Sequence, residues 1–139
     1  MENFVTWDAS YELGIDVIDK QHKHLVNLMN QLYTACLADR GELDETFKQV
    51  MKELVEYVAF HFKDEEKLME SIHYAGLNAH KQTHERFIKE ILTTVQAYQK
   101  GKQLAPNAFV RFLRDWLFNH ILVHDKDWSR HYFAVKTPL

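Results

Sequence analysis

The sequence predicts an all-α fold, an up-down-up-down bundle of four helices preceded by an N-terminal arm. Four stretches of the 139 residues place apolar side chains at alternating spacings of three and four, which is the period of one helix face. Glycine and proline supply only four and two residues, too few for a sandwich or barrel of many short strands. At this length we expect a single domain over residues 1–139.

The arm and the first helix meet near residue 17. The first 17 residues show no sustained period, so we expect them to pack on the bundle as an arm. Asp16 is a candidate N-cap. The first helix is expected to end near Asp39-Arg40-Gly41, and its apolar stripe comprises Ile18, His22, Leu25, Met29, Leu32 and Cys36.

Three more stripes follow along the chain. The second, which fades before Gly76, comprises Phe47, Val50, Leu54, Val58, His61, Glu65, Leu68 and Ile72. The third, which ends at Lys100-Gly101, comprises Leu77, His80, His84, Phe87, Ile91, Val95 and Tyr98. The fourth starts at Pro106, runs to about Trp128 and comprises Phe109, Leu113, Trp116 or Leu117, His120 and His124. Residues 129–139 carry a weaker pattern, for which we expect a short extra turn.

The charge balance and the single cysteine limit the binding partners and the cellular location that we expect. With 17 basic and 20 acidic residues and a formal net charge of −3, nothing favours binding to nucleic acid or to an anionic membrane. No run of about 18 apolar residues occurs, so we expect no membrane insertion. Cys36 cannot form an internal disulfide, and the N-terminus lacks the pattern of a secretory signal. These features favour a cytoplasmic setting. As a separate expectation, we take the chain to be a monomer.

Nine histidines are the unusual part of the composition. Every predicted helix carries histidine on its apolar stripe: His22, His61, His80 with His84, and His120. A single buried histidine is most often bonded to a backbone carbonyl. An unpaired buried imidazole costs about 1–3 kcal/mol, so five scattered ones would severely erode a marginally stable domain. We therefore expect the five to lie together.

The positions of these histidines along the helices agree with one shared layer. His22 lies about 18 residues before the first loop and His61 about 21 after it, which places both roughly 27–31 Å from that end. His84 and His120 lie at nearly equal distances, about 19 and 17 residues, from the loop near residue 103. Glu65 and His80 are each a few residues from the turn at 71–76. The sequence thus predicts a metal site between facing helices.

Spacing within the helices refines this prediction but leaves one ligand open. His80 and His84 form an i, i+4 pair, as do His61 and Glu65. The glutamate of the HExxH zinc-protease motif is missing between the paired histidines. On a regular helix the stripe neighbour of His120 is His124, whereas Asp125 lies about 140° around unless the turn is widened into a π-bulge.

A second metal motif competes with this set. Glu70-Ser-Ile-His73 has the ExxH form of ferritin-like di-iron proteins. That motif should occur twice, with two further glutamates, and this copy lies above the proposed layer. Asp64, Glu66 and Lys67 are interpreted as a solvated charge run, with only Glu65 on the stripe.

The chain resembles the hemerythrins, and specifically the single-domain bacteriohemerythrins. The resemblance covers nearly the whole chain, from Trp7 to Asp125. Its motifs are Leu13-Gly-Ile-Asp-Val-Ile-Asp-Lys-Gln-His22, His61-Phe-Lys-Asp-Glu65-Glu66, His80-Lys-Gln-Thr-His84 and Trp116-Leu-Phe-Asn-His120-Ile-Leu-Val-His-Asp125.

The resemblance also implies roles for individual residues. His80, His84 and His120 would hold one iron, and His22 and His61 the other. Glu65 and Asp125 would bridge the two, which favours Asp125 over His124. Trp116, Leu117 and Ile121 are candidates for an apolar wall around bound oxygen, with ordinary core packing as the alternative. The four other histidines would lie on the surface or contact the ligands without binding metal: His24, His73, His124 and His131.

The function that the resemblance implies is reversible binding of dioxygen at two non-heme iron ions joined by an oxo or hydroxo bridge. Such a protein would store oxygen or deliver it to oxygen-consuming enzymes, without being an enzyme itself. Two alternatives use the same ligands. One is a di-iron oxidase or peroxide-handling enzyme, and the other is an iron store or iron donor.

Overall fold

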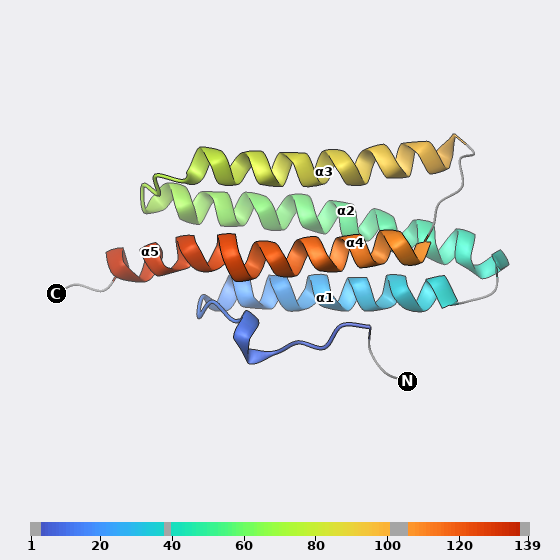
Figure 1. Cartoon of the computed structure of the whole chain (residues 1–139), viewed down its shortest axis with the longest axis horizontal. Helices are drawn as coiled ribbons and strands as arrows, with labels where there is room; N and C mark the ends of the chain where they lie inside the picture. The colour runs from blue at the N-terminus through green and yellow to red at the C-terminus, as the bar shows by residue number, and fades with distance from the viewer. Residues whose placement is uncertain (1–3, 38–39, 101–105, 137–139) are drawn as a thin grey trace.

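The computed structural model describes residues 4–37, 40–100 and 106–136, and all of the regular structure in these ranges is helical (Figure 1). The bundle helices are α1 (Asp16–Leu37), α2 (Arg40–Ser71), α3 (Leu77–Gln99) and α4 (Pro106–Asn119). A π-helix, η2 (His120–Asp125), and a last helix, α5 (Lys126–Lys136), continue the line of α4 (Figure 1). The predicted four-helix bundle with an N-terminal arm is confirmed.

The N-terminal arm runs beside α1 and contains one short 3-10 turn, η1 (Ala9–Tyr11) (Figure 1). Asn30 fixes the arm with two hydrogen bonds: its amide donates to the Val5 carbonyl at 2.9 Å, and its side-chain oxygen accepts from the Val5 N–H at 2.8 Å. The Asp19 carboxylate accepts the N–H groups of Leu13 and Gly14 at 2.8 and 3.0 Å. These bonds hold the chain against the start of α1.

The prediction that Asp16 is the N-cap of α1 is wrong. The Ile15 carbonyl accepts the first helical hydrogen bond, from the Asp19 N–H at 2.9 Å, so the cap position belongs to Ile15. Asp16 lies one residue inside the helix and forms an exposed ion pair with Lys20 at 3.1 Å.

Gly14 has φ +87°, a conformation that side chains with a Cβ rarely adopt. We expect Gly14→Ala to lower the free energy of unfolding by about 1–2 kcal/mol. An alanine Cβ would also lie 3.2 Å from Phe133 Cζ, but that ring is 40% exposed and can shift, so the backbone dominates the cost. Asparagine tolerates positive φ better and should cost less than alanine in urea denaturation. Equal costs for the two variants would contradict this explanation.

The predicted apolar stripes form the core. Two of the sequence predictions nevertheless need correction, one in the second stripe and one in the C-terminal tail. Each stripe is mainly buried; examples are Ile18, Leu32, Leu54 and Ile91. On α2, however, Met69 is fully buried where Leu68 was expected, and Leu68 packs only at the edge of the core. The expected boundaries at Asp39 and Gly101 lie outside the described residues.

The second correction concerns the C-terminal tail, which is not a short turn. It forms α5 as far as Lys136. Trp128 and Ser129 are buried in its first turn, so the helix gains tertiary packing that the weak sequence pattern did not reveal.

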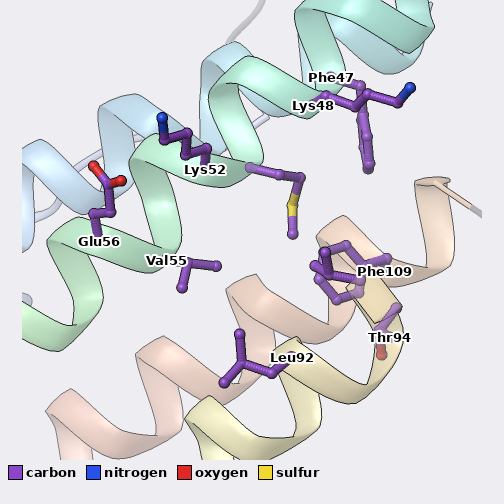
Figure 2. Close-up of a pocket in the computed structure, with 10 residues that line it drawn as sticks. Phe47, Lys48, Lys52, Val55, Glu56, Leu92, Thr94 and Phe109 are labelled. Carbon is purple, nitrogen blue, oxygen red and sulfur yellow. The ribbon is translucent and has the colours of Figure 1, made fainter. Parts of the chain in front are cut away.

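A groove of about 470 Å³ opens between α2, α3 and α4, toward the end of the bundle where α1 connects to α2 (Figure 2). Its lining is mainly apolar and includes Phe47, Met51, Val55, Leu92 and Phe109. None of its lining residues is a histidine, so the groove is separate from the histidine layer. No described helix is long and apolar enough to cross a membrane.

Candidate metal centre

The side chains predicted as metal ligands converge in one buried layer of the bundle. α1 supplies the first of them, α2 and α3 supply two each, and η2 supplies the last two. All are at most 5% exposed: His22, His61, Glu65, His80, His84, His120 and Asp125. Apolar side chains such as Leu32, Leu54 and Leu113 make up the rest of the core. The layer is therefore a polar site enclosed in an apolar core.

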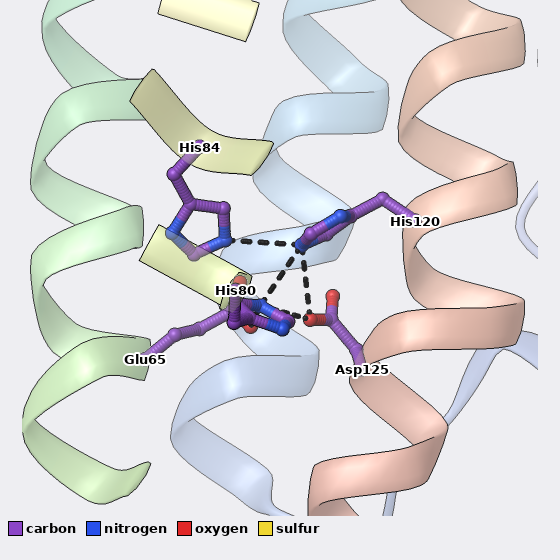
Figure 3. Close-up of side chains that lie close together, drawn as sticks. All are labelled: Glu65, His80, His84, His120 and Asp125. Atoms are coloured by element: carbon purple, nitrogen blue, oxygen red, sulfur yellow. Dashed lines mark hydrogen bonds and ion pairs between the residues drawn. The ribbon is translucent and has the colours of Figure 1, made fainter. Parts of the chain in front are cut away.

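The ligand atoms form two groups, and within each group all of them lie within 4.8 Å of one another. The larger group contains three histidines and both carboxylates: Glu65, His80, His84, His120 and Asp125 (Figure 3). The smaller group contains His22, His61 and Glu65. The two groups overlap at Glu65.

Both carboxylates lie between the two histidine groups. Glu65 Oε1 is 2.5 Å from His61 Nε2, while its Oε2 faces His80 Nε2 at 3.8 Å. Asp125 Oδ2 is 3.3 Å from His22 Nε2. Its Oδ1 is 3.2 Å from Nε2 of both His80 and His120. Each carboxylate thus presents one oxygen to each group, the arrangement needed to bridge two metal ions.

The larger group has a donor set that fits a cation. His120 Nε2 lies 3.0 Å from His84 Nε2 and 3.1 Å from His80 Nε2 (Figure 3). A pair of ring nitrogens at this distance can share only one proton, and three of them facing one point cannot all be satisfied by one another. A metal ion bound by three unprotonated nitrogens removes this conflict.

The smaller group fits a cation for a different reason. Four buried atoms in or beside this group make no hydrogen bond of normal geometry: His22 Nε2, His61 Nε2, Glu65 Oε1 and Asp125 Oδ2. Buried polar atoms without partners are costly and rare. All four face the His22 and His61 side of the layer, so a second cation there would satisfy them together.

The π-helix η2 brings Asp125 into the site. The N–H of Lys126 donates to the Ile121 carbonyl five residues earlier, the bonding pattern of a widened turn. Asp125 therefore lies beside His120 and is fully buried, while His124 is exposed on the outer side of the turn. Of the two residues that spacing left open, Asp125 is the one that lies in the buried layer.

Two outer hydrogen bonds orient ligand histidines. His61 Nδ1 lies 2.7 Å from Gln21 Oε1, and the Gln21 amide donates to Asp64 Oδ2 at 2.7 Å. His84 Nδ1 lies 2.8 Å from Glu66 Oε2. An Nδ1–H that donates to oxygen leaves Nε2 unprotonated and available to a metal.

The sequence interpretation of the charge run is thereby corrected. Asp64 and Glu66 are part of the site's outer hydrogen bonds, not merely solvated charges. Gln21 was also missed, although its place next to His22 was a weak signal.

The four remaining histidines lie outside the layer. His24, His73, His124 and His131 are exposed. His73 lies in the turn after α2 with φ 54°, and Glu70 is exposed as well. The ExxH string therefore does not contribute to the buried cluster.

The comparison with known families agrees with this geometry. A family model described as "Hemerythrin HHE cation binding domain" matches residues 13–131. The chain belongs to the hemerythrin family. The resemblance seen in the sequence is thereby confirmed, and the cation-binding description fits the buried ligand cluster.

Relatives and solved structures of hemerythrins cover most of the chain. A bacteriohemerythrin from Stenotrophomonas maltophilia is 35% identical over 126 residues, which are 90% of this chain and 79% of that protein. A bacteriohemerythrin from Pseudomonas aeruginosa is 37% identical over 117 residues, which are 84% of this chain and 74% of that protein. A crystal structure of wild-type hemerythrin superposes with a TM-score of 0.81 at 30% identity, covering 93% of this chain and 98% of that one.

The charges of the buried layer are set by burial and by mutual contacts. Burial opposes charge on His22, but Asp125 and Glu65 outweigh it and raise the pKa of His22 to about 9. Burial lowers the pKa of His84 to about 3. Burial and the Asp125 charge oppose ionisation of Glu65, yet His61 and His22 lower its pKa to about 2. The layer therefore holds ionised carboxylates beside a mixture of charged and neutral imidazoles.

These shifts predict how the stability of the chain, without bound metal, depends on pH. Above the ordinary pKa of 6.5, unfolded His22 loses its proton before folded His22 does, so stability falls as pH rises toward 9. Below 6.5, unfolded His84 gains a proton that the folded chain excludes, so stability falls toward pH 3. We expect a maximum near pH 6.5 and, from His22, a loss on the order of 3 kcal/mol by pH 9.

Urea denaturation with a chelator at pH 5, 6.5 and 9 measures this profile. His22→Gln should make the alkaline limb shallower, while His131→Gln, at an exposed position, should leave it unchanged. A wild-type stability that stays constant between pH 6.5 and 9 would refute the assignment.

The residues predicted to form an apolar wall lie beside the ligands. Trp116 is half-buried and stacks on the His120 ring at 4.5 Å with an interplanar angle of 12°. Leu117 lines a small apolar cavity of about 10 Å³, which Phe62, Phe87 and Leu113 also line. Ile121 is fully buried in η2. The structure brings all three close to the layer, where they also contribute to ordinary core packing.

Proposed function

We propose that the chain reversibly binds dioxygen at a non-heme di-iron centre, for storage or for delivery to oxygen-consuming enzymes in the cytoplasm. The observation that carries this proposal is the unequal pair of histidine groups joined by two buried carboxylates. One group offers three imidazoles and the other only two. If two ions were held by these residues, the ion on the two-histidine side would have fewer protein ligands and could accept an external one.

The donor count supports the same conclusion. His80, His84 and His120 would hold one iron, His22 and His61 the other, and Glu65 with Asp125 would bridge them. Two octahedral ions have about twelve positions, more than these side chains can fill. An oxo or hydroxo bridge would occupy two of the remainder, leaving about one for an external ligand. When bound in the ferrous state, the iron pair supplies the two electrons that reversible binding of dioxygen requires.

The chain's own residues hold the ligands in the form that binds metal. Gln21 accepts from the Nδ1 side of His61, and Glu66 does the same for His84. Phe62 stacks on His84 at 3.6 Å with parallel rings and restricts its rotation. Both the tautomer and the orientation of these imidazoles are therefore fixed before a metal arrives.

The apolar surroundings exclude water from the layer. Leu117 and Ile121 are buried, and Trp116 covers one face of His120. A dry apolar wall favours a small neutral ligand such as dioxygen over ions, and it limits access of protons and reductants. We assign these three residues to the oxygen-binding pocket.

The predominance of imidazole favours binding over turnover. Neutral imidazoles donate less charge than a shell rich in carboxylates, so release of unchanged oxygen is favoured over cleavage of the O–O bond. Bacterial relatives named bacteriohemerythrin support the same class of function. We therefore favour an oxygen carrier over an oxidase, a peroxide-handling enzyme or an iron store.

Optical spectroscopy of the reduced, iron-loaded chain tests the proposal. We expect a visible charge-transfer band to appear in air, to disappear under argon and to return in air over several cycles. A band that never forms, or that forms once and does not reverse, contradicts reversible binding. Sustained consumption of oxygen with an added reductant would favour an enzyme instead.

A further inference from the structure

Trp128 lies in the first turn of α5 and is fully buried against the two carboxylates of the metal layer. Its indole Nε1–H donates to Asp125 Oδ1 at 3.1 Å and to Glu65 Oε2 at 3.2 Å. One N–H group is thus shared by two carboxylates from different helices.

The indole differs in kind from the other groups that contact these carboxylates. Those contacts come from Nε2 atoms of His22, His61, His80 and His120. A ring nitrogen that binds a metal carries no proton and cannot donate a hydrogen bond. With metals in place, these histidines would no longer donate to the carboxylates. Among the described residues that contact both carboxylates, Trp128 would then be the one that still donates a hydrogen bond.

The hydrogen bonds are also one-sided. Asp125 Oδ1 and Glu65 Oε2 are the oxygens that face the three-histidine group. Their partner oxygens, Asp125 Oδ2 and Glu65 Oε1, face His22 and His61 and receive no hydrogen bond of normal geometry. The indole therefore acts on the carboxylate oxygens of one metal position and not on those of the other.

We propose that Trp128 is a positioning residue that holds Glu65 and Asp125 in register and withdraws charge from the oxygens facing the three-histidine position. This inference rests on the proposed function, because it assumes a metal pair in the layer. A hydrogen-bonded carboxylate donates less charge to its metal, which favours the lower oxidation state. Trp128 thereby stabilises the ferrous form and slows loss of the iron held by three histidines.

The local sequence explains how the indole reaches this place. Trp128 follows Asp125 by three residues, nearly one turn of α-helix, so it lies on the same side of the chain as that carboxylate. This register exists only if helical structure continues beyond η2. The tail helix α5 is therefore part of the metal site's support.

Replacing the N–H alone is the sharpest test. Site-specific incorporation of 3-benzothienylalanine at position 128 keeps the shape of tryptophan but puts sulfur in place of the indole N–H. Trp128→Phe is the second variant. Trp7, which packs on Tyr11 in the N-terminal arm and whose Nε1 makes no hydrogen bond, provides the matched control for both substitutions.

Two measurements on iron-loaded protein under argon give the readout, so neither depends on oxygen binding. We expect the midpoint potential to fall in both Trp128 variants. We also expect one of the two irons to pass to a chelator about 10-fold faster than in wild type, the size typical for loss of an outer partner. The Trp7 controls should leave both the potential and the release rate unchanged.

The outcomes separate this inference from the proposed function. A wild-type chain that holds no iron pair overturns both. A wild-type chain that holds the pair, with unchanged potential and release rate in the benzothienyl variant, overturns the role of Trp128 alone. Loss of thermal stability without a change in potential would assign Trp128 to core packing only and would likewise overturn the inference.

Discussion

Replacing Glu65 by alanine is expected to reduce the iron bound per chain from about two ions to fewer than one. Glu65 is the residue common to both ligand groups, and each of its oxygens faces a different set of histidines. Without Glu65, each metal position would lose one ligand. The two metal ions would also lose one of the two buried carboxylates that balance their positive charge. Metal analysis after removal of free iron measures the loss.

Two matched variants sharpen this prediction. Asp125→Ala should have an effect of similar size, because Asp125 also faces both groups. Glu70→Ala removes an exposed carboxylate from the same helix as Glu65 and should leave the iron content at its wild-type value. Retention of about two irons by Glu65→Ala would show that the carboxylates are not shared ligands.

Removing the metal is expected to lower the free energy of unfolding by about 4 kcal/mol or more. A ligand present at about 1,000 times its dissociation constant stabilises the folded state by this amount. Without metal, the buried layer keeps polar atoms that have no normal hydrogen bond and ring nitrogens that crowd one another. Denaturant unfolding of the loaded chain and of the chelator-stripped chain at the same pH gives the difference.

The Glu65→Ala chain is the control for this second prediction. If stabilisation comes from metal in the layer, a chelator should shift the unfolding midpoint of wild type and leave that of Glu65→Ala nearly unchanged. Equal shifts in the two chains would place the stabilising ion elsewhere. No shift in wild type would mean that the layer is stable without metal.

The helices and the histidine layer could be predicted from the sequence because both follow from the helical repeat of apolar residues. Apolar side chains must face the core, and a helix rises by a fixed amount per residue, so His22 and His61 were assigned a common level without any knowledge of packing. The structure has both fully buried in one layer. Local periodicity was sufficient for this part of the site.

Other features depend on contacts between elements, which one helical period does not specify. Asp125 enters the site only because the turn after His120 widens, and a regular helix would have presented His124. Glu66 looked like a solvated charge, since its role depends on how α2 and α3 are rotated toward each other. Trp128, at the expected end of the fourth helix, donates to both carboxylates of the layer, and its place in the sequence did not indicate this contact.

The stoichiometry of oxygen uptake tests the central claim most directly. The reduced, iron-loaded chain is exposed to a measured amount of dioxygen, the uptake is followed with an oxygen electrode, and the gas is then removed with argon. We predict uptake of about one dioxygen for each pair of irons, followed by its return, with the same amount taken up again in the next cycle. Uptake that continues beyond this ratio, or oxygen that is consumed and not returned, would contradict reversible binding at a di-iron centre.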